Sequence, residues 1–258
     1  MRIILISLLR AYSRRTLMQQ RLQQLGLDFE ILDATDGATI TDEQRARVDH
    51  TARKCITCYP LSDNEIGCYF SHLRAIELIA HGPDAMGAIL EDDVTLAPDL
   101  AAGLNAIEAR GLPFDVITLH RTMKNGEIFA PCAELLPDLQ LGRIGYTHMN
   151  LQGYVISRSG ALRFLRHVQA RGIGHAVDKE MHRYWANGLD IYGLSRPLVT
   201  HADHGHSIID ETRAPRAAYP DAGRLCWRWA RFQTKIIDSI AKRWAFGKYV
   251  RQGKAAHR

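Results

Sequence analysis

Three consecutive carboxylates, Glu91-Asp92-Asp93, follow a short apolar segment at residues 86–90. If that segment is a strand, the alternation of side chains directs Glu91 and Asp93 to one side and Asp92 to the other. Acidic groups this close repel each other and raise each other's pKa unless a cation lies between them. A solvated acidic turn is the alternative. Because open α/β sheets bind ligands beyond the carboxyl ends of their strands, the position favours a site for a hard divalent cation, as a diphosphate requires.

The segments around this acidic run alternate between strand and helix patterns. Residues 3–6 are continuously apolar and β-branched, as in a strand that is covered on both faces. Ser62-Asp63-Asn64-Glu65 is a capping box that begins a long helix. We expect further strands at residues 29–32, 86–90, 114–119, 153–157 and 191–194, and helices at 16–25, 66–79, 98–110, 160–169 and 177–185. This alternation predicts an α/β domain with a mainly parallel central sheet.

Size and charge narrow the class of protein. The chain has 258 residues, 46% of them hydrophobic, and a formal net charge of +5. From Arg224 onward it carries ten basic residues and one acid, so the remaining residues 1–223 have a balance of −4. The body is therefore not expected to bind nucleic acid. The apolar start is too short for a membrane span or a signal peptide, so we expect a soluble protein of the cytoplasm.

The five cysteines are odd in number and widely spaced, which indicates free thiols. Cys55 and Cys58 form a CxxC pair that, with Cys68 and His72, would complete a four-ligand zinc set. Cys68 and His72 lie inside the predicted long helix, and a second close cysteine pair is missing. Ordinary thiols are therefore the favoured interpretation.

A set of short motifs spread over roughly residues 1–210 carries a family resemblance. The most specific are Leu61-Ser62-Asp63-Asn64-Glu65-Ile66-Gly67-Cys68-Tyr69-Phe70-Ser71-His72 and Ile89-Leu90-Glu91-Asp92-Asp93-Val94. They are accompanied by Leu8-Leu9-Arg10 with Arg14, Asp33-Ala34-Thr35-Asp36-Gly37, Gly153-Tyr154-Val155-Ile156-Ser157 with Gly160-Ala161, and the isolated Asp178. The chain thereby resembles glycosyltransferase family 25, which comprises bacterial lipooligosaccharide galactosyl- and glucosyltransferases and the collagen galactosyltransferases. One departure is Ser7, where the family's opening strand is expected to carry Asn.

This resemblance implies a GT-A-like fold, a nucleotide-sugar donor that is usually UDP-linked, and an inverting displacement at the anomeric carbon. It also implies transfer of a hexose, galactose or glucose, to a lipooligosaccharide or other cell-surface glycan. Mn²⁺ or Mg²⁺ on Asp93 would neutralise the leaving diphosphate, with Glu91 directed to the metal or the ribose. Arg10 and Arg14 would pair with phosphate or uracil oxygens, or alternatively only cover a helix surface.

Inversion in one step needs a base that removes the acceptor hydroxyl proton, and Asp178 is our choice. As the alternative, Asp178 is the N-cap of the helix at residues 177–185, and Glu180 is the reserve base. His201, His204 and His206 follow a late strand pattern, and we assign His206 to the metal shell, a plain surface histidine being the alternative. We place Glu65 and His72 at the donor site, although His72 equally fits a satisfied core histidine.

Two other functions compete with transfer. One is a metal-dependent nucleotide-sugar hydrolase or nucleotidyltransferase, although the sequence contains no P-loop or GxGxxG motif. The other is a non-catalytic glycan-binding module, which would be expected to lack the acidic pair that Glu91 and Asp93 provide.

The basic tail has its own pattern, so we divide the chain into a glycosyltransferase domain at residues 1–223 and a tail at 224–258. Six apolar residues recur in the tail at steps of three or four: Leu225, Trp229, Phe232, Ile236, Ile240 and Trp244. Basic residues adjoin them: Arg224, Arg228, Arg231, Lys235 and Lys242. An amphipathic helix of this kind lies on anionic lipid, here the inner face of the cytoplasmic membrane, where a glycolipid acceptor would be found. Packing of the helix against the negatively charged body is the alternative.

Overall fold

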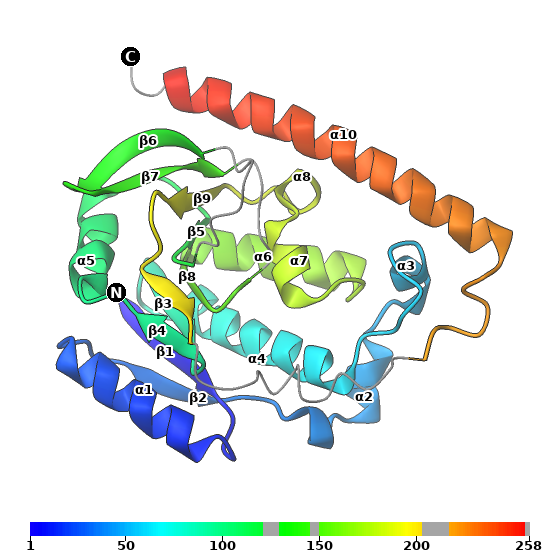
Figure 1. Cartoon of the computed structure of the whole chain (residues 1–258), viewed down its shortest axis with the longest axis horizontal. Coiled ribbons are helices and arrows are strands. Elements are labelled where there is room, and N and C mark those ends of the chain that lie inside the picture. Colours follow the sequence, from blue (N-terminus) through cyan, green and yellow to red (C-terminus); the bar gives the residue numbers. More distant parts are fainter. Residues whose placement is uncertain (121–128, 145–149, 203–216, 256–258) are drawn as a thin grey trace.

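The protein is a mixed α/β structure built on one large sheet (Figure 1). The structure, a computed structural model, describes residues 1–120, 129–144, 150–202 and 217–255, with side chains up to Arg251. In order across the sheet, the eight strands are β2 (Glu30–Asp33), β1 (Arg2–Ser7), β3 (Met86–Glu91), β8 (Gly153–Ser157), β5 (Val116–Thr118), β9 (Ile191–Leu194), β7 (Leu139–Ile144) and β6 (Phe129–Leu136). The pairings make β7 and β8 run against the other six, so the predicted mainly parallel sheet is confirmed.

Strand β1 shows how the sequence builds a core on each face of the sheet. Ile4 and Ile6 belong to a core formed with helices α4 (Asp63–Ala80) and α6 (Arg158–Arg171). Ile3 and Leu5 point the other way, into a core formed with α1 (Tyr12–Gln24) and α5 (Leu100–Arg110). The continuous β-branched run is thus buried on both faces, as a central strand requires.

The long helix α4 begins as the sequence predicts. Ser62 Oγ accepts a hydrogen bond from the Glu65 backbone N–H at 3.2 Å, and the Ser62 N–H donates to Glu65 Oε2 at 2.8 Å. The capping box is therefore confirmed. Three short helices lie between β2 and α4 in the chain: η1 (Gly37–Thr39), α2 (Asp42–Ala46) and α3 (His50–Lys54).

A second, two-stranded sheet lies beside the acidic run. Strand β4 (Val94–Leu96) pairs with β10 (Val199–His201) in antiparallel register, with Val94 opposite His201. The acidic run lies between the end of β3 and the start of β4. The pairing of β10 with β4 therefore brings His201 next to that run.

The single helix predicted at residues 177–185 is wrong, because the structure has two short helices there. They are α7 (Val177–His182) and α8 (Tyr184–Asn187), which meet at Arg183. The Asn187 amide donates to the carbonyls of Glu180 at 2.7 Å and Met181 at 2.9 Å. These bonds satisfy carbonyls at the end of α7, so the chain can turn there.

Two further differences concern loops and the tail. The hairpin of β6 and β7 occupies part of residues 123–150, which the sequence analysis left without regular structure. The tail forms the helix α10 (Leu225–Ala255), which crosses the outside of the molecule near α8 and β6 (Figure 1). Among the helices of the described residues, none is both long enough and apolar enough to cross a bilayer. The domain boundary at residue 223 stays a prediction.

Candidate active site

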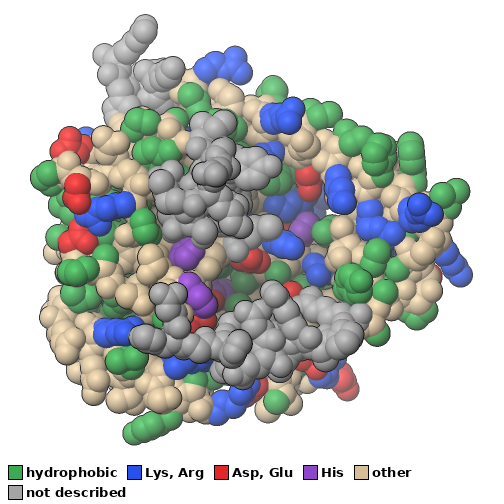
Figure 2. Space-filling model, viewed as in Figure 1, with side chains coloured by type: hydrophobic (Ala, Val, Ile, Leu, Met, Phe, Trp, Pro, Cys, Tyr) green, Lys and Arg blue, Asp and Glu red, His purple; other side chains and the backbone are tan. Residues whose placement is uncertain are grey.

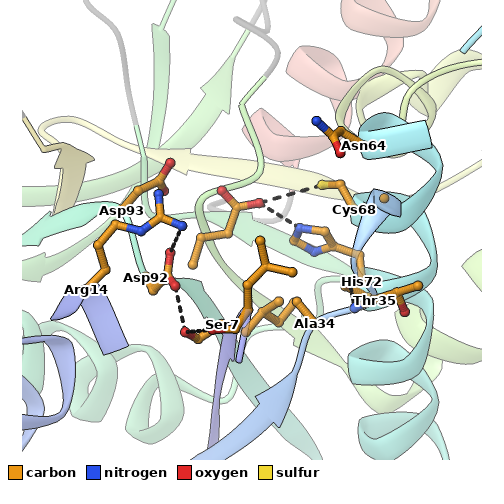
Figure 3. Close-up of a pocket in the computed structure, with 14 residues that line it drawn as sticks. Ser7, Arg14, Ala34, Thr35, Asn64, Cys68, His72, Asp92 and Asp93 are labelled. Atoms are coloured by element: carbon orange, nitrogen blue, oxygen red, sulfur yellow. Dashed lines mark hydrogen bonds and ion pairs between the residues drawn. The ribbon is translucent and has the colours of Figure 1, made fainter. Parts of the chain in front are cut away.

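A pocket opens at the carboxyl ends of β1, β2 and β3, where ligands bind in open α/β sheets. It encloses about 620 Å³, its open mouth included. One wall is helix α4, which contributes Cys68, Ser71 and His72, and the opposite wall carries Arg14. The close-up in Figure 3 shows side chains of both walls directed toward the acidic run.

All three carboxylates of the acidic run line this one pocket. The prediction that Asp92 points to the opposite side is therefore wrong. Strand β3 ends at Glu91, and Asp92 and Asp93 lie in the turn before β4, where the alternation of a strand no longer applies. The chain thus places three acidic groups around one space.

Glu91 faces helix α4. It accepts a hydrogen bond from His72 Nε2 at 2.9 Å, and the Cys68 thiol lies 3.9 Å from its Oε1. Because the ring nitrogen Nε2 donates to the carboxylate, Nδ1 accepts from the Tyr154 hydroxyl at 3.1 Å. His72 is therefore both a satisfied, buried histidine and a residue that orients a pocket carboxylate.

Asp92 is held by the other wall (Figure 3). Ser7 Oγ donates to its Oδ2 at 2.6 Å, and Arg14 Nη2 lies 3.2 Å from its Oδ1. Burial raises the pKa of Asp92 even though Ser7 and Arg14 act in the opposite sense. Ser7, the departure from the family pattern, thus has a definite partner that the sequence analysis did not anticipate.

Asp93 is the most perturbed of the three acids. Burial, followed by the charges of Glu91 and Asp92, raises its pKa to about 6. The Gln152 side-chain amide donates to Asp93 Oδ1 at 3.1 Å and to His201 Nδ1 at 2.8 Å. Gln152 gave no signal in the sequence, because its position beside Asp93 depends on the pairing of β8 with β3.

The oxygen-rich side of the pocket fits a hard divalent cation such as Mn²⁺ or Mg²⁺. Its carboxylates accept hydrogen bonds but donate none when ionised. Burial, and then the charges of Glu91 and Asp92, raise the pKa of Asp93, and a cation bound there would offset both. Ligand atoms of Cys68, His72 and Glu91 also lie within 4.8 Å of one another, a mixed sulfur, nitrogen and oxygen set that suits a softer ion. Among the described residues, Cys55 and Cys58 do not join this group.

The structure separates the predicted donor-site residues. Arg14 lines the pocket, whereas Arg10 does not and instead pairs with Asp36, its Nη2 lying 3.2 Å from Asp36 Oδ1. Glu65 lies at the start of α4, where its carboxylate completes the capping box. His204 and His206 lie outside the described residues, while His201 contacts Gln152 behind the acidic run.

Asp178 and Glu180 are both on α7 but have different surroundings. The N-cap of α7 is Ala176, so the alternative that Asp178 caps this helix is wrong. Burial is the main cause of the raised pKa of the Cys68 thiol, and the charges of Glu91 and then Asp178 add to it. Asp178 is not among the residues that line the pocket. Burial acts to raise the pKa of Glu180, but hydrogen bonds with His167 at 2.6 Å and His175 at 2.8 Å lower it to about 2. Glu180 is buried and bound to both imidazoles, so it is not suited to be a reserve base.

The match to a family model decides the relationship of this chain. The model described as "Glycosyltransferase family 25 (LPS biosynthesis protein)" matches residues 1–181. The chain belongs to glycosyltransferase family 25. The predicted relationship is confirmed, and the α/β architecture agrees with the GT-A-like fold expected for the family.

Two curated relatives, both from animals, show the extent of the match. The chain is 30% identical over 175 residues to procollagen galactosyltransferase 1-A of Xenopus laevis. This match covers 63% of this chain and 28% of that protein. It is 26% identical over 246 residues to "Probable inactive glycosyltransferase 25 family member 3" of Bos taurus, with coverage of 86% and 40%. The chain thus spans less than half the length of these relatives. The solved galactosyltransferase LgtC, with bound donor and acceptor sugar analogues, is 11% identical with a TM-score of 0.43, covering 90% of this chain and 96% of that one.

Proposed function

We propose that this family 25 glycosyltransferase moves a hexose, galactose or glucose, from a UDP-sugar to a lipooligosaccharide or other cell-surface glycan, with inversion. The observation that carries the proposal is the convergence of Glu91, Asp92 and Asp93 on one pocket at the carboxyl end of β3. A binding module without catalysis would not need three carboxylates in one pocket, two of which, Asp92 and Asp93, have a raised pKa because of burial and the neighbouring acidic charges.

Donor binding uses both walls of the pocket. Asp93, together with Glu91, would hold Mn²⁺ or Mg²⁺, which neutralises the charge that develops on the leaving diphosphate. Arg14 adds positive charge on the opposite side and is held in place by Asp92 at 3.2 Å. His72 keeps the Glu91 carboxylate directed into the pocket through a hydrogen bond of 2.9 Å.

Asp178 would act on the acceptor as the general base. Its carboxylate removes the proton from the acceptor hydroxyl while that oxygen attacks the anomeric carbon, and the bond to the diphosphate breaks on the opposite side. What supports this assignment is the influence of its charge on the thiol of Cys68, which lines the α4 wall, although Asp178 itself is not among the residues that line the pocket. Attack from the side opposite to the leaving group requires the base and the diphosphate to lie on different sides of the sugar.

The test is a donor screen of the purified chain against the common UDP- and GDP-sugars, with Mn²⁺ and with excess chelator. We expect transfer from one UDP-hexose to a small soluble glycan acceptor, and loss of that transfer in chelator. Sugar release that does not depend on an acceptor would instead favour the hydrolase. Donor binding without sugar transfer and without sugar release would favour the binding module.

We also propose that the enzyme works in the cytoplasm at the inner membrane face, where a lipid-linked acceptor is presented. What supports this is the tail, in which basic and apolar side chains share one exposed helix.

A further inference from the structure

We infer that the outward side of α10 is a docking surface for an anionic lipid bilayer. We call this side the outer face and define it by Leu225, Trp229, Phe232, Ile236, Ile240 and Trp244. The biological role of this docking rests on the proposed function, because a lipid-linked acceptor would be found at the bilayer surface. Lipid binding itself requires no transfer and is measured separately.

The opposite side of α10 is fixed to the body, which sets the orientation of the helix. Asp238 accepts hydrogen bonds from Arg183 at 2.8 Å and from the Trp185 indole at 3.0 Å. About three helical turns further on, the Tyr249 hydroxyl donates to the Leu189 carbonyl at 2.9 Å. Ala245 and Tyr249 also pack against the core under α8. The alternative that the tail packs on the body is therefore right for this side of the helix.

The outer face remains in solvent. Its six residues are 43% to 78% exposed, and the neighbouring Ile237 is 63% exposed. They recur at steps of three or four, so they form one stripe along several turns of the helix. An apolar stripe with two tryptophans in water is unusual for a protein surface and is typical of a surface that binds something.

The charges beside the stripe indicate an anionic occupant. Six basic side chains next to it are exposed: Arg224, Arg228, Lys235, Arg243, Lys248 and Arg251. The one acid in α10, Asp238, lies on the docked side. Figure 2 shows basic and hydrophobic side chains interspersed along the edge of the molecule that α10 forms. Two basic residues that the sequence analysis counted are not available, because Arg231 donates to backbone carbonyls of the body and Lys242 is half-buried.

A bilayer fits this combination better than a second copy of the chain. Two copies that met through the outer face would bring their basic side chains together, and like charges so placed repel. A helix of 31 residues is about 46 Å long and offers a straight surface parallel to its axis. Tryptophan in the headgroup region and basic residues at the flanks are the features of an interfacial helix.

The experiment measures co-sedimentation of the full chain with vesicles of phosphatidylglycerol, or of phosphatidylcholine alone, over a range of salt. We expect binding to the anionic vesicles that weakens with salt, since contacts of exposed charges are screened. The variant Trp229→Gln/Ile240→Gln should bind about tenfold more weakly or worse, because it removes two apolar anchors. The matched control Leu17→Gln/Leu162→Gln changes exposed leucines on α1 and α6 and should bind like the parent.

Three results would overturn the inference. One is a parent protein that ignores anionic vesicles at low salt, and another is an outer-face variant that sediments like the parent. The third is a dimer in lipid-free solution that the outer-face variant abolishes and that vesicles do not compete with. All variants should transfer sugar to a soluble acceptor at the parent's rate. Vesicle binding by a chain that transfers no sugar would contradict the proposed function and leave the docking surface standing.

Discussion

Replacing Asp93 by asparagine should make the metal-free protein more stable while it removes activity. The pKa of Asp93 is raised from 3.8 to about 6, so between those two values the folded state binds more protons than the unfolded state. The free energy of unfolding therefore falls as the pH rises through this window. At pH 7.5 the carboxylate is charged in both states, and holding it charged in the fold costs stability.

The size of this cost follows from the shift. A change of about two pKa units corresponds to roughly 3 kcal/mol, and partial exposure of the side chain reduces this to about 1–3 kcal/mol. Asparagine keeps the oxygen that accepts from Gln152 at 3.1 Å, so the variant loses little else. For a chain of this length, each kcal/mol moves the melting temperature by about 2–4 °C, which gives an expected rise of roughly 2–12 °C.

The assay is thermal unfolding of the parent and Asp93→Asn in chelator at pH 7.5 and pH 4.5. We expect the variant to melt higher at pH 7.5 and the difference to shrink at pH 4.5, where the parent's Asp93 is protonated in the fold. Excess Mn²⁺ should then raise the melting temperature of the parent and leave the variant unchanged. The control is Asp36→Asn, because a hydrogen bond from Arg10 lowers the pKa of Asp36 and removal of that charge should not stabilise the fold.

Two outcomes would refute this reasoning. If Asp93→Asn melts lower than the parent at pH 7.5 in chelator, the charge of Asp93 is satisfied by the fold and does not require a cation. If Mn²⁺ stabilises the variant as strongly as it stabilises the parent, the cation does not bind through Asp93.

The remaining predictions concern the base, a close contact and a buried acid. Asp178→Asn should lower turnover by about 10²–10⁴ with donor affinity and melting temperature unchanged, and a loss of only a few-fold would contradict a role as base. Gly67→Ala should weaken donor binding and lower the melting temperature, because the added carbon would lie 2.5 Å from the Thr35 carbonyl beside the pocket; Gly223→Ala, in open space, is the silent control in both assays. Glu180→Gln should cost about 1–3 kcal/mol in denaturant unfolding at pH 7, since it removes a buried charge bonded to two histidines. Because the pKa of Glu180 is lowered to about 2, that contribution is present above pH 4.5 in the parent and is lost as the pH falls toward 2, so an equal loss at both ends of this range would contradict it.

Local patterns in the sequence predicted what depends on neighbours in the chain. The strands at residues 153–157 and 191–194 and the capping box at Ser62 and Glu65 have the predicted bounds. The acidic run after a buried strand predicted where the pocket would be, because a parallel sheet presents the carboxyl ends of its strands at one edge. These features need only alternation, spacing and turn chemistry, which are properties of short segments.

Features that depend on contacts between distant segments were decided only by the tertiary structure. Asp92 joins the pocket because β3 ends one residue before it, and Gln152 reaches Asp93 because β8 pairs with β3. Asn187 splits a helical pattern in two by bonding to carbonyls six and seven residues earlier. In the tail, the helical period predicted the apolar stripe, but which charged residues face the body was set by the partners that the body offers. These are Arg183 and Trp185 for Asp238, and a backbone carbonyl for Arg231. A sequence pattern defines the faces of a helix, and only the neighbours in space decide which face they cover.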